Sequence, residues 1–179
     1  MTIKFSSLKK GQIILFITSE TKYSYVNNEI LKNYVNKEED YCVYITVNKA
    51  YATLIKELKA KKIDTSKFLI IDAITPVSSG TRVGNAIFIG SPRALTNISL
   101  TLTSALKKVP EGKRLLFLDS ISTLLVYNNL GTVSKFSNFI INKMREWKVT
   151  GAIISLEKEK AEGITKYLSQ IVDRVIEVK

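Results

Sequence analysis

The sequence predicts a three-layer α/β fold in which helices flank a mostly parallel central sheet. Two observations carry this prediction. Short apolar runs alternate with segments that repeat apolar residues at helical spacing, from near the first residue to the last. In addition, 45% of the 179 residues are hydrophobic, which is enough for a substantial core and for a single domain over residues 1–179.

The first part of the chain is expected to alternate strand and helix twice. A continuous apolar run predicts a buried strand over 12–18, and apolar residues on one face predict a helix over about 24–36. A second apolar run at 41–47 predicts the next strand. The helix expected over about 51–62 carries its lysines largely off the apolar stripe, so these lysines should face water.

The middle of the chain contains a loop between two strands. A third strand is expected over 68–73, and residues 75–85 combine proline, serine, glycine and arginine, which is typical of a loop. A short strand over 86–90 should follow. Ser91 and Pro92 resemble a helix cap and a first helical position, and apolar residues at helical spacing continue beyond them.

The last part of the chain adds three strands and two helices. A buried strand over 115–119 is followed by a turn, after which Thr132 is expected to cap a long helix with a wide apolar face. We then expect a strand over 151–156, a short helix over 161–169 and a final strand over 172–178.

The chain is strongly basic, with a formal net charge of +11 and a pI near 9.6. Such a charge favours nucleic acid, anionic membrane surfaces or acidic proteins as partners. However, most of the 27 basic residues are lysines rather than the arginines that bind phosphates and bases in bidentate fashion. No compact basic block is interleaved with aromatic residues. Nucleic-acid binding is therefore a secondary hypothesis, and lysines that solvate helix surfaces are the simpler interpretation.

Histidine is absent, and Cys42 is the single cysteine. The sequence therefore excludes a disulfide within the chain and argues against histidine triads and typical catalytic zinc sites. No apolar run approaches the roughly 20 residues needed to cross a bilayer, and residues 1–12 lack the pattern of a secretory signal. We expect a cytoplasmic protein without membrane insertion.

The strand over 115–119 delivers Asp119 to its carboxyl end, directly before Ser120. Four apolar residues followed by an aspartate form the Walker B pattern of phosphate-handling α/β proteins, in which the aspartate helps to hold Mg²⁺. The usual companion of this motif is a loop of the form GxxxxGKS or GxxxxGKT, whose glycines let backbone amides approach the phosphates. The early segment 13–23 contains no glycine. The sequence thus predicts a nucleotide-enzyme scaffold whose catalytic parts are degraded.

Four segments occur in an order and at a spacing that carry a family resemblance: Gly11 to Ile17, Tyr44 to Lys49, Leu115 to Leu124, and Ile171 to Val178. Together they resemble the RecA superfamily, and specifically its KaiC-like branch, over nearly the whole chain. The resemblance implies a RecA/KaiC-like P-loop-NTPase-type fold. In that branch the segments correspond to the strand before the phosphate loop, the strand that commonly ends in an acidic pair, the Walker B strand, and an aspartate before the final strand. The sequence especially resembles archaeal proteins of this branch that lack a proper P-loop.

Two departures from the KaiC-like pattern bear on catalysis. If Lys22 stands for the P-loop lysine, Tyr23 occupies the place of the Mg²⁺-binding Ser or Thr, and Ser24 comes one position late. Asn48 and Lys49 stand where an acidic pair would polarise the attacking water, and neither side chain accepts a proton at neutral pH. Both departures argue against ATP hydrolysis, so no catalytic residue is expected.

Residual phosphate binding stays an open alternative, because a helix that begins near Ser24 would present unpaired amides at its positive end. The candidate nucleotide- or phosphate-binding residues are Thr18, Ser19, Thr21, Lys22, Ser24, Asp119 and Ser120. The other interpretation is that Ser19, Thr21 or Ser24 merely caps the helix.

Asp119 also has two interpretations. It would be a metal ligand only if Mg-nucleotide binds. Otherwise it is an inherited structural hydrogen-bond acceptor at the strand end, for which Ser120 and Ser155 are the candidate partners.

Three functions remain. The leading hypothesis is a catalytically inactive KaiC/RecA-like domain that regulates or binds a protein, such as an active ATPase homologue. The first alternative is a nucleotide- or phosphate-binding sensor that retains Asp119, with weakly bound Mg-nucleotide as its only cofactor. The second is a nucleic-acid-binding protein that uses the net positive charge. Rings in this superfamily often hold nucleotide between neighbours, so the loss of the phosphate cradle favours a monomer or dimer.

Overall fold

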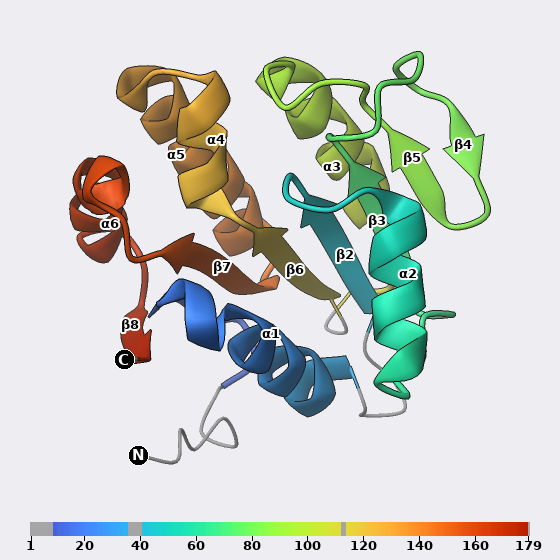
Figure 1. Cartoon of the computed structure of the whole chain (residues 1–179), viewed down its shortest axis with the longest axis horizontal. Coiled ribbons are helices and arrows are strands. Elements are labelled where there is room, and N and C mark those ends of the chain that lie inside the picture. Colours follow the sequence, from blue (N-terminus) through green and yellow to red (C-terminus); the bar gives the residue numbers. More distant parts are fainter. Residues whose placement is uncertain (1–8, 36–40, 112–113, 179) are drawn as a thin grey trace.

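The computed structural model describes residues 9–35, 41–111 and 114–178 (Figure 1). Within them, eight strands form one sheet in the order β4-β5-β3-β2-β6-β7-β1-β8, and every neighbouring pair is parallel except β4 and β5. The strands are β1 (Ile13–Thr18), β2 (Tyr41–Thr46), β3 (Phe68–Asp72), β4 (Arg82–Val83), β5 (Ala86–Phe88), β6 (Arg114–Asp119), β7 (Thr150–Leu156) and β8 (Arg174–Val178).

Helices cover both faces of the sheet, which confirms the predicted three-layer arrangement (Figure 1). They are α1 (Glu20–Val35), α2 (Tyr51–Ala60), α3 (Leu95–Lys108), α4 (Ile121–Tyr127), α5 (Leu130–Glu146), the 3₁₀ helix η2 (Glu159–Ala161) and α6 (Glu162–Ser169). Buried side chains of α1 and α2 pack on one face, and those of α3, α4, α5 and α6 pack on the other. Successive side chains of a strand point to opposite faces of the sheet, so the strands contribute to both cores. In β6, Leu115 and Phe117 face the first layer, and Leu116 and Leu118 face the second.

All the predicted strands are present, with ends displaced by one or two residues. Helix starts differ more. α3 begins at Leu95 rather than directly after Ser91, because Ser91 accepts a hydrogen bond from the Arg93 amide and forms a separate turn. Asn129, not Thr132, caps α5: the Asn129 side chain accepts from the Thr132 amide at 2.9 Å. None of the described helices is both long and apolar enough to span a membrane.

The aspartate before the final strand has a structural function. Asp173 and Ile13 exchange two hydrogen bonds: the Asp173 carboxylate accepts from the Ile13 amide at 2.8 Å, and the Asp173 amide donates to the Ile13 carbonyl at 2.9 Å. The carboxylate also pairs with Arg145 at 3.0 Å, and Arg145 donates to the Ile171 carbonyl. These contacts fix the start of β8 against β1.

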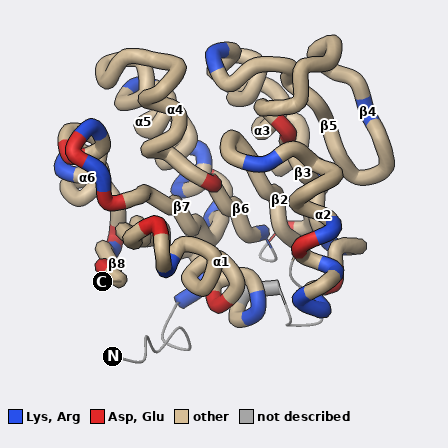
Figure 2. Tube along the Cα trace, in the orientation of Figure 1, with Lys and Arg blue, Asp and Glu red and all other residues tan. Residues whose placement is uncertain are grey.

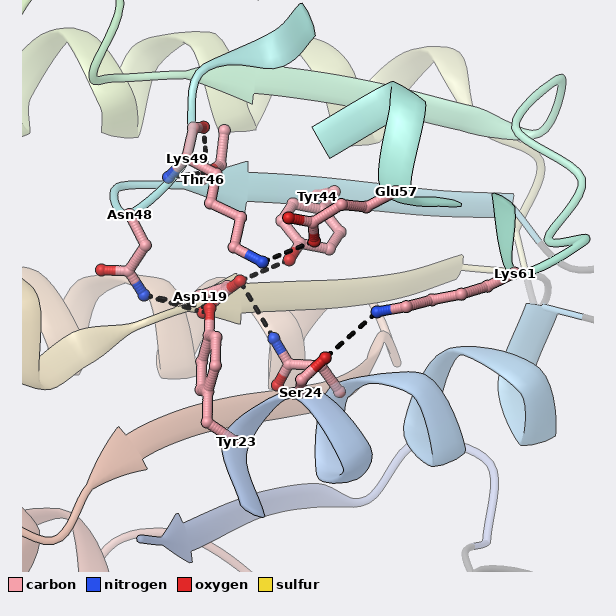
Figure 3. Close-up of polar contacts among 10 residues, drawn as sticks. Tyr23, Ser24, Tyr44, Thr46, Asn48, Lys49, Glu57, Lys61 and Asp119 are labelled. Carbon is pink, nitrogen blue, oxygen red and sulfur yellow. Dashed lines mark hydrogen bonds and ion pairs between the residues drawn. The ribbon is translucent and has the colours of Figure 1, made fainter. Parts of the chain in front are cut away.

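The strand order determines where polar side chains meet. β6, which ends at Asp119, lies between β2 and β7, and β7 separates it from β1. Because these strands are parallel, their carboxyl ends lie along the same edge of the sheet, where this class of fold places its ligands. α1 leaves β1 at that edge, contacts β7 and brings its first two turns beside Asp119 (Figure 3).

Candidate functional site

β1 passes into α1 almost without a loop. β1 ends at Thr18 and α1 begins at Glu20, so one residue, Ser19, lies between them. A phosphate loop needs several residues between strand and helix to wrap the phosphates. The predicted helix start near Ser24 is wrong. Glu20 is favourable at the positive end of the helix and forms an ion pair with Lys158 at 2.7 Å, and these interactions support an early first turn.

The predicted phosphate-binding residues at this end of α1 do not converge on one point. The hydroxyls of Ser19 and Thr21 hydrogen-bond each other at 3.0 Å on the surface. Ser24 lies one turn further along the helix, is exposed, and accepts from the Lys61 ammonium at 3.2 Å. Ser24 is therefore not the helix cap, and its hydroxyl bonds Lys61 rather than Asp119, although both residues line the same small cavity.

The remaining two candidates of this segment are also apart from Asp119. Thr18 is buried, and its hydroxyl makes a long hydrogen bond of 3.3 Å to the Ser19 carbonyl. Lys22 lies in the first turn of α1 and is exposed, whereas its neighbour Tyr23 points toward Asp119 (Figure 3). Successive helical residues point about 100° apart, so Lys22 cannot share the direction of Tyr23.

Asp119 is almost completely buried and accepts hydrogen bonds from four protein side chains (Figure 3). Its Oδ1 accepts from the Tyr23 hydroxyl and from the Asn48 amide at 3.0 Å. Its Oδ2 accepts from the Tyr44 hydroxyl and from the Asn27 amide at 3.1 Å. Tyr23 and Asn27 are one turn apart on α1 and so share a face. A carboxylate has about four acceptor positions, and the protein uses all of them.

The charges around this carboxylate are arranged to keep its donors protonated. Burial raises the pKa of Asp119 above that of a free carboxyl group, although the hydrogen bonds from Tyr23, Tyr44 and Asn48 act in the opposite direction. Burial and the Asp119 charge raise the pKa values of Tyr23 and Tyr44 far above that of a free tyrosine, so both hydroxyls stay protonated. The Lys49 ammonium adds a favourable Coulomb interaction with Asp119 while pairing with Glu57 at 2.5 Å.

The residues around Asp119 do not fit a magnesium ion. Mg²⁺ requires octahedral oxygen ligands at about 2.0–2.1 Å. Here the tyrosine hydroxyls and amide groups direct hydrogen atoms at both carboxylate oxygens. In the described part of the chain, there is also no group of three or more His, Cys, Asp or Glu side chains that could hold a metal. Asp119 as placed here is a hydrogen-bond acceptor.

Ser120 belongs to a different cluster. Its hydroxyl hydrogen-bonds those of Ser122 and Thr123 at 3.1 and 2.9 Å, and Ser122 accepts from the Leu156 amide at 2.9 Å. Among the described residues, the Ser155 hydroxyl makes one long contact, of 3.5 Å, with the Leu156 carbonyl. The hypothesis that Ser120 or Ser155 would hold Asp119 is therefore wrong. These hydroxyls join the start of α4 to the end of β7.

The sequence reasoning missed three of the residues that build this edge of the sheet. Asn27 and Tyr44 were not recognised as donors to Asp119, and Asp72 was not recognised at all. A usable signal did exist for Asn27, because an asparagine four residues after Tyr23 on the buried side of a helix requires a polar partner. Tyr44 places a phenol hydroxyl among the β2 side chains that face α1 and α2, which is a comparable signal.

Asp72 fixes the neighbouring strand end. It is completely buried at the end of β3, and it accepts the amides of Tyr51 at 2.8 Å, Ile74 at 2.8 Å and Thr75 at 2.9 Å. The Thr75 hydroxyl donates a fourth bond at 2.6 Å. Tyr51 is the first residue of α2, so the carboxylate lies at the positive end of that helix.

We expect Asp72→Ala to lower the free energy of unfolding by about 3 kcal/mol, because it leaves buried amides without an acceptor. Urea unfolding followed by circular dichroism measures this. Asp64→Ala is the matched control: Asp64 is exposed and accepts only local hydrogen bonds, from Ser66 in the described structure, so its loss should cost under about 1 kcal/mol. Equal effects for the two variants would contradict the structural role of Asp72.

A cavity of about 290 Å³ opens at the carboxyl ends of β1 and β7, beside the start of α1. Its lining residues are Ile17, Leu156, Glu157, Lys158, Glu159, Glu162 and Thr165. Three of the four charged side chains are glutamates, and the single lysine is paired with Glu20. This lining repels a polyanion such as a triphosphate.

A much smaller cavity lies between α1 and α2, beside Asp119. Its volume of about 20 Å³ has room for about one water molecule. Asn27 lines this cavity, and its Oδ1 has no hydrogen-bond partner among the described residues. A water molecule that donates to this atom fits the space, and a nucleotide does not.

A protein-family model described as "ATPase: KaiC" matches residues 7–179. The chain belongs to the KaiC-like ATPase family. This confirms the predicted RecA superfamily and KaiC-like branch. The family's description names ATP chemistry, whereas the Asp119 carboxylate of this chain is surrounded by protein donors.

The fold of this KaiC-like chain also agrees with a solved structure. The crystal structure of the KaiC-like protein PH0186 from the hyperthermophilic archaeon Pyrococcus horikoshii OT3 matches with a TM-score of 0.69 and 14% sequence identity. The match covers 96% of this chain and 74% of that chain. At this identity the likeness shows the fold alone. A search of curated proteins gives no match.

Proposed function

We propose that this chain is a catalytically inactive member of the KaiC-like ATPase family that acts by binding a protein. The observation that carries the proposal is that the Asp119 carboxylate already accepts four hydrogen bonds, from Tyr23, Asn27, Tyr44 and Asn48. A carboxylate that must hold Mg²⁺ beside phosphates needs free lone pairs on the side of the nucleotide. Here that side is occupied by the Tyr23 hydroxyl.

The connection between β1 and α1 supports the same conclusion. Phosphoryl transfer depends almost entirely on positioning and charge stabilisation by a phosphate cradle, a lysine and a metal ion. One residue separates the strand from the helix, and Lys22 points away from Asp119 on the helix surface. The nearby acidic cavity would further oppose a triphosphate.

The residues in place of the acidic pair support the absence of hydrolysis. Asn48 uses its amide as a donor to Asp119, and Lys49 pairs with Glu57. A water molecule that attacks a phosphate needs a residue to orient it or accept its proton. Neither an amide nitrogen nor an ammonium group accepts a proton at neutral pH.

Retention of the whole KaiC-like scaffold without this chemistry favours a binding role. Proteins of the same fold share backbone shape and helix faces, so an active ATPase homologue is the partner class that we propose. Such a partner would be recognised through surface shape, and no bound nucleotide would be needed.

An ATP hydrolysis assay tests the proposal directly. We expect purified protein with millimolar Mg-ATP to release phosphate no faster than the Lys22→Ala and Asp119→Asn variants prepared in the same way. The variants serve as controls, because a contaminating ATPase would give the same rate in all three samples. Turnover that is present in the wild type and lost in both variants would overturn the proposal.

A further inference from the structure

A cavity of about 460 Å³ lies at the edge of the sheet opposite to Asp119. Gly11, which precedes β1, and Thr150, the first residue of β7, both line it. Because β1, β6 and β7 are parallel, the cavity opens at the amino ends of these strands, whereas Asp119 lies at the carboxyl end of β6. The remaining lining residues are Lys10, Arg145 and Lys148. This cavity is therefore separate from the site described above.

The lining of this cavity is cationic. Three of its five residues are basic, and none is acidic. Figure 2 shows basic residues where the described chain begins, before β1. Two carboxylates of this region are already paired: Asp173 with Arg145 at 3.0 Å, and Glu146 with Lys143 at 2.7 Å. The cavity should therefore attract anions, in contrast to the glutamate-rich cavity at the carboxyl ends of β1 and β7.

Arg145 is held in one orientation beside the cavity. Its Nη1 donates to the Asp173 carboxylate at 3.0 Å, and its Nη2 donates to the Ile171 carbonyl at 2.8 Å. A guanidinium has five N–H groups, so these contacts leave others for a ligand. The side chain is 47% exposed, so a ligand can reach it from solvent. An oriented, planar guanidinium binds phosphate oxygens in pairs.

Thr150 adds a hydroxyl donor to the lining. It is 7% exposed, and its Oγ1 accepts from the Gly11 amide at 2.9 Å, which leaves the hydroxyl hydrogen to donate. A Cβ at Gly11 would meet no atom within 4 Å, so the space beside this glycine is open. A hydroxyl donor and an oriented guanidinium therefore border the same cavity.

Lys148 occupies a backbone position that favours glycine. It follows α5 with a φ of +52°. Its amide donates to the Arg145 carbonyl at 3.2 Å, and the Val149 amide donates to the Met144 carbonyl at 2.8 Å. This is the Schellman ending of a helix, in which glycine is the usual residue at the left-handed position. Glycine would suit the backbone better, whereas lysine supplies an ammonium group to the cavity.

We propose that this cavity binds a small phosphate compound that carries no metal ion, such as inorganic pyrophosphate or a phosphate monoester. An ammonium group, a guanidinium and a hydroxyl are donors suited to phosphate oxygens. The cavity volume lies within the range of about 300–1,000 Å³ that is common for small-molecule sites.

Other phosphate ligands suit the cavity less well. None of its described lining residues is aromatic, so a nucleotide base has no ring to stack on. In Mg-ATP the metal already neutralises part of the phosphate charge. A nucleic acid would need a basic groove that follows its backbone rather than one cavity. The proposal is independent of whether the chain hydrolyses ATP or binds a protein.

Calorimetric titration of the full chain with inorganic pyrophosphate, in EDTA and about 150 mM salt, tests the proposal. We expect saturable binding with a Kd below about 1 mM. Lys148→Gly should raise this Kd at least about tenfold, because it removes a charged donor from the cavity. The melting temperature of this variant should not fall, since glycine adopts a positive φ without strain.

Lys62→Gly is the matched control. Lys62 follows α2 with a φ of +58°, forms the same Schellman ending and does not line the cavity. Both variants lose one ammonium group from the same backbone position, so their net charges are equal. The Lys62→Gly variant should keep the pyrophosphate Kd of the wild type.

Two further titrations separate this site from other anion sites. Lys22→Ala changes the carboxyl edge of the sheet and should leave the pyrophosphate Kd unchanged, and citrate should bind more weakly than pyrophosphate. An unchanged Kd in Lys148→Gly, equal weakening in both glycine variants, or loss of binding in Lys22→Ala would overturn the proposal. So would tighter binding of citrate, or no saturable heat up to about 10 mM pyrophosphate.

Discussion

Replacing Asp119 by alanine should lower the free energy of unfolding by about 4 kcal/mol, near the upper end of single-residue effects. Four donors lose their acceptor, and two of them belong to Asn27 and Tyr44, which are buried. Buried donors that lose a charged acceptor keep their desolvation cost without compensation. Thermal and urea unfolding measure the loss.

The sign of this effect distinguishes the two interpretations of Asp119. A carboxylate kept for metal binding is usually a cost to the stability of the metal-free protein, so its removal is neutral or stabilising. A structural acceptor is required for stability itself. An Asp119→Ala variant as stable as the wild type in the absence of metal would show that the hydrogen-bond network is not structural.

Tyr44→Phe should lower the free energy of unfolding by about 2 kcal/mol, because it deletes one hydrogen bond to a charged group inside the core. The same change in an Asp119→Ala background should cost less than about 0.5 kcal/mol, since the acceptor is already absent. The double-mutant cycle therefore predicts a coupling energy of about 1.5–2 kcal/mol.

The matched control for this cycle is Tyr25→Phe. Tyr25 is 49% exposed on α1, and its hydroxyl is not among the donors to Asp119. Its replacement should change stability by under about 0.5 kcal/mol in either background. Additive effects of Tyr44→Phe and Asp119→Ala would mean that the two groups do not interact in solution.

The fold was predictable because its signals are local. Leu115 to Leu118 form a continuous apolar run, which is typical of a strand buried between two helical layers, and the structure buries all four residues. The alternation of such runs with helical patterns leaves few arrangements other than a parallel sheet. Asp173, which the family resemblance places before the final strand, also has a definite structural role.

The site was less predictable because its geometry depends on contacts between distant residues. The start of α1 at Glu20 is accompanied by an ion pair with Lys158, which lies 138 positions away in the chain and gives no local sequence signal. The early start places Tyr23 and Asn27 over Asp119. With the later start, Tyr23 would belong to a loop.

Asp72 illustrates a second limit of the sequence. An aspartate at the end of an apolar strand can bind a ligand, a metal or nearby backbone amides, and the sequence does not distinguish these. The structure gives Asp72 three amides and a hydroxyl. Asp119, in the equivalent position at the end of β6, instead receives only side-chain donors.

Under the function proposed above, this difference describes how a KaiC-like domain would lose its chemistry and keep its fold. A buried Walker B carboxylate needs compensation, and a bound Mg-nucleotide can supply part of it in an active enzyme. In this chain Tyr23 and three other side chains donate hydrogen bonds to that carboxylate, and we expect them to supply the compensation.

The most direct test is calorimetric titration of the purified protein with Mg-ATP at physiological salt. It asks whether Asp119 is a structural hydrogen-bond acceptor or part of a nucleotide-binding site. We predict no saturable heat up to millimolar ATP. Saturable binding in the wild type that is lost in a folded Asp119→Asn variant would contradict it, and would identify the chain as a nucleotide sensor.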